Sequence, residues 1–135
     1  MIAHIQRQRF DLYAAGRRLH VERLCPAHAA VGPTLVFLHE GLGSIGQWRD
    51  FPAQLCIRVG RPGLVYERWG YGRSDPLAGS RPKDYLRQEA EITLPEVLAA
   101  CEIIDSPILF GHSAVSYTHL DVYKRQSLDR SLMSI

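Results

Sequence analysis

The sequence predicts an α/β fold, with a mostly parallel sheet, flanking helices and an amino-terminal β-hairpin. Short apolar runs rich in β-branched and aromatic residues stand at 34–39, 64–66 and 108–110, as expected for strands buried on both faces. Segments with helical periodicity separate them, at 48–59 and 84–104. Strands that alternate with helices over short connections are typical of βαβ units, and therefore of a parallel sheet.

Residues 8–24 predict the hairpin, because apolar and polar side chains alternate on both sides of a turn signal at Ala15-Gly16. The apolar positions are Phe10, Leu12, Ala14, Leu19 and Val21. A linker rich in Ala, Pro and Gly is expected to follow over residues 25–33.

The first helix is predicted from apolar residues at spacings of three and four. These residues are Trp48, Phe51, Leu55 and Val59. They would form one buried face of a helix that ends at Gly60. Pro52 is expected in the first turn, where its missing N–H is harmless.

The second helix is predicted over residues 84–104. Its apolar stripe consists of Leu94, Val97, Leu98 and Cys101. Thr93 and Glu96 have the spacing of a capping box around Pro95, which predicts a kink or a restart there. Glu89, Glu91 and Glu96 are expected on a solvated face.

Composition and charge argue against several classes of function. The chain has 135 residues, the size of one domain, and a formal net charge of +2. Its basic residues form no stripe, so we expect no nucleic-acid partner and no membrane association. No apolar run approaches the roughly 18 residues of a membrane span, and residues 1–9 do not resemble a signal peptide. The three widely spaced cysteines predict no disulfide framework, and the cytoplasm is the expected location.

Three loops with candidate chemistry directly follow predicted core strands, at 39–44, 67–75 and 111–114. Ligands bind beyond the carboxyl ends of the strands in open parallel sheets. We therefore expect the three loops to converge on a site for a small-molecule substrate.

We expect most polar residues and glycines in and near the first two loops to have structural rather than catalytic roles. His39 is expected to hydrogen-bond to backbone rather than to touch substrate. Arg68 and Arg73 are expected to anchor loops rather than to hold a substrate carboxylate. Gly70 and Gly72 would serve tight backbone geometry rather than phosphate binding. Trp48 is expected in the core or in a pocket wall.

Three motifs in this order resemble the amino-terminal half of an α/β-hydrolase, over residues of about 8–113. L-V-F-L-H-E-G-L-G-S at 35–44 is similar to the strand and H-G-x oxyanion loop of that family. Y-E-R-W-G-Y-G-R-S at 66–74 is similar to its D-R-x-G-x-G-x-S turn, and L-F-G-H-S at 109–113 to its nucleophile elbow.

The resemblance implies that Ser113 is the nucleophile of an acyl-transfer reaction and that the family's later acid and histidine activate it. The backbone N–H groups of Ala114 and Gly41 would bind the oxyanion. Glu40 stands where the family has glycine, so the second donor stays open between Glu40, Gly41 and Leu42. Glu40, Leu42 and His112 are the candidate substrate-binding residues.

The resemblance ends at the elbow. Val115 replaces the closing glycine of G-x-S-x-G, and the run from Val115 to Gln126 resembles translated sequencing-adaptor sequence. We therefore divide the chain into residues 1–114, the amino-terminal part of an α/β-hydrolase domain, and residues 115–135, a non-native tail. His119 and Asp121 lie in that tail and are not expected to belong to a triad.

The predicted function is that of a serine hydrolase. Its substrate would be a small ester, a lactone or a carbon–carbon bond next to a carbonyl, and no cofactor or metal is implied. This chain, a truncated α/β-hydrolase fold without the acid and base, is expected to be poorly stable and nearly inactive. An acyltransferase or a cofactor-free haloperoxidase on the same fold remains an alternative. So does a non-catalytic α/β-hydrolase-like binding protein. The sequence predicts no oligomeric state.

Overall fold

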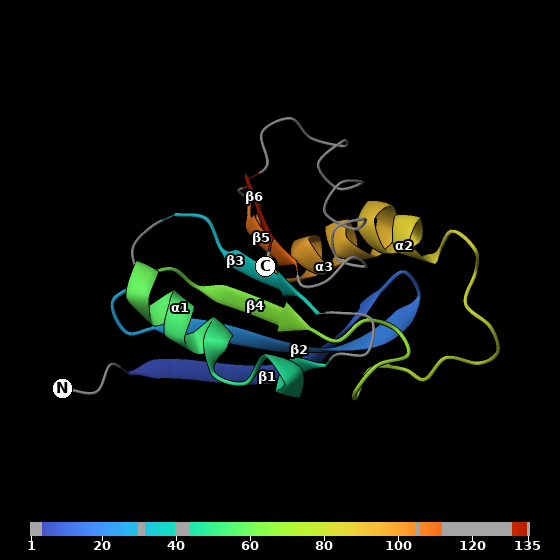
Figure 1. The fold of residues 1–135 in the computed structure, drawn as a ribbon, viewed down its shortest axis with the longest axis horizontal. Helices are drawn as coiled ribbons and strands as arrows, with labels where there is room; N and C mark the ends of the chain where they lie inside the picture. Colours follow the sequence, from blue (N-terminus) through green and yellow to red (C-terminus); the bar gives the residue numbers. More distant parts are fainter. Residues whose placement is uncertain (1–3, 30–31, 40–43, 105, 112–130, 135) are drawn as a thin grey trace.

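The computed structural model describes residues 4–29, 32–39, 44–104, 106–111 and 131–134 (Figure 1). Within these ranges the strands form one six-stranded sheet of order β1-β2-β4-β3-β5-β6. The strands are β1 (Ile5–Ala14), β2 (Arg17–Pro26), β3 (Leu35–Leu38), β4 (Gly63–Tyr66), β5 (Ile108–Gly111) and β6 (Ser131–Ser134). β2 runs antiparallel to both β1 and β4, whereas the pairings of β3 with β4, β3 with β5 and β5 with β6 are parallel. The predicted mostly parallel sheet with a hairpin at its start is confirmed.

The hairpin turns at the predicted dipeptide. Ala15 and Gly16 have φ angles of 53° and 74°, the positive values that a two-residue primed turn requires. The pairing continues further than expected, because Cys25 and Pro26 still face Gln6 and Ile5 across the ladder. The linker therefore begins after Pro26 rather than at Cys25.

The central strands are buried on both faces, as their continuous apolar sequences predicted. Every residue of β3 and of β4 is buried. Alternate side chains of the sheet enter two separate apolar clusters. One cluster combines the sheet residues Leu19, Val21, Val36, Leu38, Leu64, Tyr66 and Leu109 with Ala90, Leu94, Val97, Leu98 and Cys101. The other combines Leu24, Leu35, Phe37, Val65 and Phe110 with Ile45, Trp48 and Cys56. Helices thus cover both faces of the sheet (Figure 1).

The first helical region differs from its prediction in which face is buried. A 3-10 turn, η1 (Ile45–Trp48), precedes the helix α1 (Phe51–Val59), and Arg49 between them has a φ of 53°. The predicted stripe is confirmed in part: Trp48 is buried and Leu55 packs against the same cluster, whereas Phe51 and Val59 are 40% and 48% exposed. The residues that α1 buries are Pro52, Ala53 and Cys56. The predicted end at Gly60, which has φ 65°, and the predicted place of Pro52 in the first turn are confirmed.

The second helical region runs from α2 (Tyr85–Gln88) through a π-helical turn, Glu89–Thr93, into α3 (Leu94–Ala100). The predicted capping box is wrong, because Thr93 is itself helical, with φ −65° and ψ −51°, and its side chain caps nothing. The π turn lies just before Pro95, where the ring removes a backbone donor. Glu96 instead accepts a hydrogen bond from the N–H of Ala15 at 3.0 Å. The predicted stripe of Leu94, Val97, Leu98 and Cys101 is buried.

Candidate functional site

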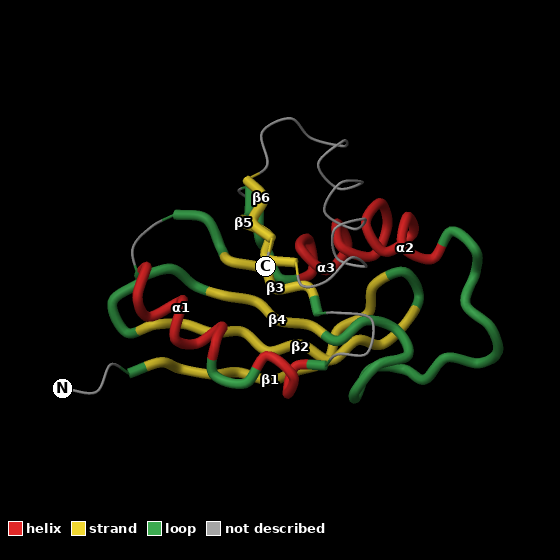
Figure 2. Tube along the Cα trace, in the orientation of Figure 1, coloured by secondary structure: helices red, strands yellow, loops and turns green. Residues whose placement is uncertain are grey.

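Three parallel strands end level with one another at one edge of the sheet. Leu38, at the end of β3, is in register with Tyr66 of β4 on one side and with Gly111 of β5 on the other. The segments that follow β3, β4 and β5 therefore start from the same edge, as expected for a ligand site in a parallel sheet. The long connection from β4 to α2 runs out beyond this end of the sheet (Figure 2).

The predicted reaction centre itself lies outside the described residues. This applies to Ser113, Ala114 and His112 after β5, and to Glu40, Gly41 and Leu42 after β3. The adaptor-like run from Val115 to Gln126 lies outside them as well. The described residues show instead how the neighbouring backbone is held.

His39, the residue after β3, is bound by a buried arginine. Both His39 and Arg68 are only 1% exposed. The backbone N–H of Arg68 donates to Nε2 of His39 at 3.0 Å, which confirms the interpretation of His39 as a partner of backbone. The guanidinium Nη2 of Arg68 donates to the backbone carbonyl of His39 at 2.7 Å and lies 3.2 Å from its Nδ1. Arg68 thus anchors a loop, as its sequence context predicted.

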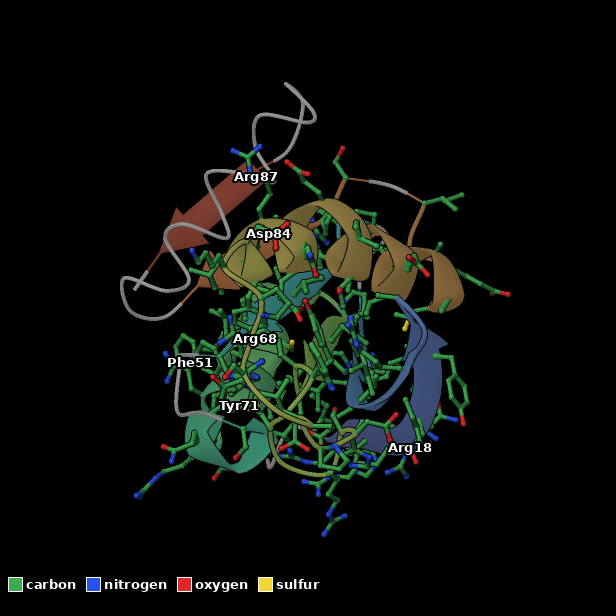
Figure 3. All side chains as sticks on the ribbon, turned by 90° about the vertical axis from the view of Figure 1, so that its right-hand side faces the viewer. Arg18, Phe51, Arg68, Tyr71, Asp84 and Arg87 are labelled. Carbon is green, nitrogen blue, oxygen red and sulfur yellow. The ribbon has the colours of Figure 1, made fainter. Side chains whose placement is uncertain are left out.

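Tyr71 and Arg81 complete the packing around this pair. The ring of Tyr71 meets that of His39 edge-on, with centroids 4.8 Å apart. The guanidinium groups of Arg68 and Arg81 lie 5.5 Å and 4.7 Å from the centroid of Tyr71. Arg68 and Tyr71 lie close together below the helical region in Figure 3. The segment after β4 therefore packs directly against the end of β3.

Glu67 ties the loops after β3 and β4 together, a role that the sequence analysis missed. Its buried carboxylate accepts hydrogen bonds from the backbone N–H of Ile45 at 2.9 Å and of Arg73 at 2.8 Å. Gly72 leaves room for that carboxylate, since a Cβ there would lie 2.1 Å from it, and its φ is +51°. The interpretation of Gly72 as a tight-backbone residue is confirmed. Ser74 donates from Oγ to the carbonyl of Glu67.

Glu89 is buried, and its predicted place on a solvated face is wrong. Only 2% of it is exposed. Burial raises the pKa of its carboxyl to about 7, against the opposing effect of Arg68, Arg17 and Arg81. These three arginines belong to segments outside the helix, so their effect on the pKa of Glu89 cannot be read from the helix sequence alone.

A cavity of about 260 Å³ lies at the opposite end of the sheet. Its lining includes Thr34 and Gly63, at the starts of β3 and β4, with Cys101 and Ile103 after α3. It is therefore at the amino ends of the parallel strands, away from the loops that carry the predicted chemistry. Among the described residues no group of His, Cys, Asp and Glu is arranged to hold a metal. No helix in the described ranges has the length and apolarity to cross a membrane.

Comparison with known proteins identifies the architecture. No protein-family model and no curated protein sequence matches the chain. Solved structures do match it. Epoxide hydrolase A from Mycobacterium thermoresistibile aligns with a TM-score of 0.75 and 17% identity, over 96% of this chain and 39% of that protein. A CIB-like hydrolase from Thermoplasma acidophilum aligns with a TM-score of 0.78 and 14% identity, over 98% and 63%.

The carboxylesterase CesB from Bacillus subtilis is a third similar structure, with a TM-score of 0.69 and 18% identity, over 96% of this chain and 42% of that protein. The chain thus spans between 39% and 63% of the length of these three proteins. At identities this low the likeness concerns the fold, and together with the sheet order it shows that the chain has the α/β-hydrolase fold.

Proposed function

We propose that this chain is part of a serine hydrolase that works through an acyl-enzyme, with Ser113 as the nucleophile. The observation that carries the proposal is the register of β5 with β3, which brings Gly111 level with Leu38. The segments with the nucleophile and with the second oxyanion donor then start from adjacent strands at one edge. The names of the similar structures, a carboxylesterase and an epoxide hydrolase among them, support hydrolytic chemistry.

The proposed reaction begins with attack of the Ser113 Oγ on a substrate carbonyl carbon. The carbonyl oxygen becomes an oxyanion, which accepts hydrogen bonds from the backbone N–H groups of Ala114 and Gly41. Collapse of this intermediate expels the leaving group and leaves an acyl-serine, which water hydrolyses. A histidine oriented by a carboxylate would take and return the proton.

The proposed substrates are small esters, lactones or compounds with a carbon–carbon bond next to a carbonyl. The chemistry needs no cofactor, because the nucleophile and the oxyanion donors are groups of the polypeptide. The proposed partner is therefore a small molecule. We also propose that the enzyme is cytoplasmic.

Covalent labelling of the full chain tests the proposal. The chain is incubated with a fluorophosphonate, and mass spectrometry of the peptide with Ser113 reports the modification. Oxyanion binding alone retains about 10³–10⁴-fold catalysis over water in a triad enzyme, so we expect slow but selective labelling of Ser113. Steady-state turnover of an activated ester is expected to be very low.

Two variants make the labelling specific. Ser113→Ala is expected to abolish it, whereas Ser80→Ala, at an exposed serine of the β4–α2 connection, is expected to leave its rate unchanged. Equal labelling of several serines, or none on Ser113 after prolonged incubation, would contradict the proposal. Transfer of the acyl group to an added alcohol in preference to water would favour the acyltransferase alternative.

A further inference from the structure

β1 forms one edge of the sheet (dark blue in Figure 1) and is ten residues long. Among the described residues it pairs only with β2, in a one-to-one register from Ile5 to Ala14 without a bulge. It contains neither proline nor lysine. Bulges, prolines, lysines and a short length are the features that usually keep an edge strand from pairing with another chain. β1 lacks all four and therefore offers a template for a further strand, whereas β6 at the opposite edge has only four residues.

Every second residue of β1 directs its backbone N–H and C=O groups away from the sheet. The two-residue turn at Ala15-Gly16 makes Ala14 and Arg17 a hydrogen-bonded pair, and such pairs recur at every second residue of the hairpin. The far side of β2 agrees with this pattern, because the carbonyl of His20 accepts a hydrogen bond from Glu67 and so points away from β1. The outward residues of β1 are therefore Ile5, Arg7, Arg9, Asp11 and Tyr13. No described residue hydrogen-bonds to their outward backbone groups.

The charged side chains along this edge complement a second copy of the same strand. Two antiparallel copies of β1 related by a two-fold axis at Phe10 would place Arg9 opposite Asp11 of the second copy, twice. The side chains of Arg9 and Asp11 are 51% and 40% exposed, and opposite charges in this position stabilise a strand pair. An axis moved by one residue would set two Arg9 or two Asp11 side chains against each other, which is unfavourable. The charge pattern therefore favours the axis at Phe10.

Each of the two charged residues already has a partner in its own chain. Nε of Arg9 lies 2.7 Å from Oε2 of Glu22, and Nδ1 of His20 lies 2.8 Å from Oδ1 of Asp11. All four side chains are on one face of the hairpin, because Arg9 faces Glu22 and Asp11 faces His20 in the register. The pairs between copies would therefore extend these contacts into one network across the interface.

Phe10 and Leu12 give the edge an apolar component on the opposite face. Both pack against the apolar cluster on the α3 side of the sheet, yet each is only partly buried. With the axis at Phe10, the two Phe10 rings would be cross-strand neighbours, and aromatic pairs of this kind stabilise sheets. Tyr13, which is 74% exposed, would lie opposite Arg7 of the second copy. Pairing would thus remove apolar surface from water.

We propose that β1 is a self-association edge, at which two copies of this chain join their β1 strands antiparallel across a two-fold axis at Phe10. Backbone hydrogen bonds would then form between Arg9 and Asp11, and between Arg7 and Tyr13, of opposite copies. Ile5 would lie opposite Ala15, beyond the end of β1, and stay unpaired. The inference is independent of the proposed function, since it uses neither Ser113 nor the loops after the parallel strands.

Amide hydrogen exchange of the full chain, followed by nuclear magnetic resonance over a concentration series, tests the proposal at each residue. Sedimentation equilibrium at the same concentrations gives the dimeric fraction. Four amides should exchange more slowly as the dimer forms, those of Arg7, Arg9, Asp11 and Tyr13. Where roughly nine-tenths of the chains are dimeric, we expect exchange to be slowed by about tenfold, because it then proceeds through the monomer. The amide of Phe10 bonds to β2 and should be protected at every concentration, while the rate for Ile5 should not change.

A proline substitution separates the backbone contacts from the side-chain contacts. Arg9→Pro removes an outward N–H that makes no hydrogen bond to β2, so the hairpin should persist while the dimer is lost. Arg9→Ala keeps this N–H and loses only the side-chain pairs, so it should dimerise more weakly. Urea unfolding of both variants at low concentration checks that they fold.

Charge reversal tests the register without touching the backbone. Arg9→Asp and Asp11→Arg each set like charges opposite one another in a homodimer, so each variant alone should be monomeric. An equimolar mixture of the two variants should dimerise, because opposite charges then meet at both positions. Arg58→Asp, at an exposed arginine of α1, is the matched control and should dimerise like the wild type.

A chain that stays monomeric up to about 1 mM would overturn the proposal. So would a dimer in which the amides of Arg9 and Asp11 exchange as fast as in the monomer, or a dimer that Arg9→Pro leaves intact. Slowed exchange of Ile5 on dimerisation would place the axis at Arg9 and overturn the register. Recovery of the dimer only when the two charge-reversal variants are mixed would support both the edge and the register.

Discussion

Oε2 of Glu67 lies 2.9 Å from the backbone nitrogen of Ile45, across the gap between two loops. Glu67 follows β4, and Ile45 begins the turn η1 that follows the loop after β3. The other carboxylate oxygen accepts the N–H of Arg73, so one side chain satisfies two backbone donors. Since a buried donor without an acceptor is costly, this carboxylate stabilises the ends of both loops.

Replacement of Glu67 by alanine should destabilise the fold strongly. It leaves the N–H groups of Ile45 and Arg73 without their acceptor; the Ile45 donor is buried and its loss costs about 1–3 kcal/mol, whereas the donor of the exposed Arg73 costs less because water can replace the carboxylate. The free energy of unfolding, measured in urea, checks this. Glu67→Gln keeps one acceptor oxygen and should lose less. Similar stability of the alanine variant and the wild type would contradict the assigned role.

Gly72→Ala should be far more damaging than Gly79→Ala. Both glycines have positive φ angles, +51° and +89°, so both substitutions carry a backbone strain of about 1–2 kcal/mol. Only at Gly72 would the new Cβ meet the Glu67 carboxylate, at 2.1 Å, whereas the surroundings of Gly79 are open. Movement of the carboxylate would break its two hydrogen bonds. Thermal unfolding of the two variants measures the difference, and equal losses would disagree with this geometry.

Glu89→Gln should remove a pH dependence of stability. The carboxyl has a pKa of about 7 in the folded chain and an ordinary value of 4.5. Between these values the folded state keeps a proton that the unfolded state has lost, so stability decreases as the pH rises toward 7 and is level above it. The decrease due to Glu89 is on the order of 3 kcal/mol. Urea unfolding between pH 5 and 8 measures it, and an unchanged slope in Glu89→Gln would exclude this residue as its source.

One thiol should react well before the other two in the native chain. Cys25 is half-buried, whereas Cys56 and Cys101 are buried, and burial raises the pKa of Cys56 to about 12. The thiolate is the reactive form, so we expect Ellman's reagent at pH 8 to modify Cys25 first. Cys25→Ser should remove the fast phase, and urea should expose the remaining thiols. A fast phase that survives this substitution would point to a different accessible cysteine.

The parts of the fold that local pattern determines were predicted. Alternation and a turn dipeptide predicted the hairpin around Ala15-Gly16, and continuous apolar runs predicted the buried strands. The helical repeat of apolar residues, one turn every 3.6 residues, predicted the buried stripe that begins at Leu94. Each of these features follows from burying apolar area on one regular element.

Features that depend on contacts between distant segments were missed. Glu89 has the sequence pattern of a surface residue in its helix, but it is 2% exposed, and Arg68 and Arg17, remote in the sequence, oppose the rise of its pKa by burial. The exposed Phe51 follows a break in the backbone at Arg49, whose φ is 53°, and no helix or turn pattern in the sequence predicts that break. The role of Glu67 had one indication in the sequence, namely Gly72, which leaves space for the Glu67 carboxylate. The predicted nucleophile Ser113 and its oxyanion donors remain predictions.

β3 occupies the middle of the sheet, yet its two neighbours are made at different times during synthesis. β4 follows it after one helix, whereas β5, whose Ile108 pairs with Leu35, emerges only after the whole second helical region. A nascent chain must therefore keep one edge of β3, with its backbone N–H and C=O groups, unpaired while the ribosome adds dozens of further residues. At about 5–20 residues per second this interval lasts several seconds, long enough for a chaperone to bind the unfinished sheet.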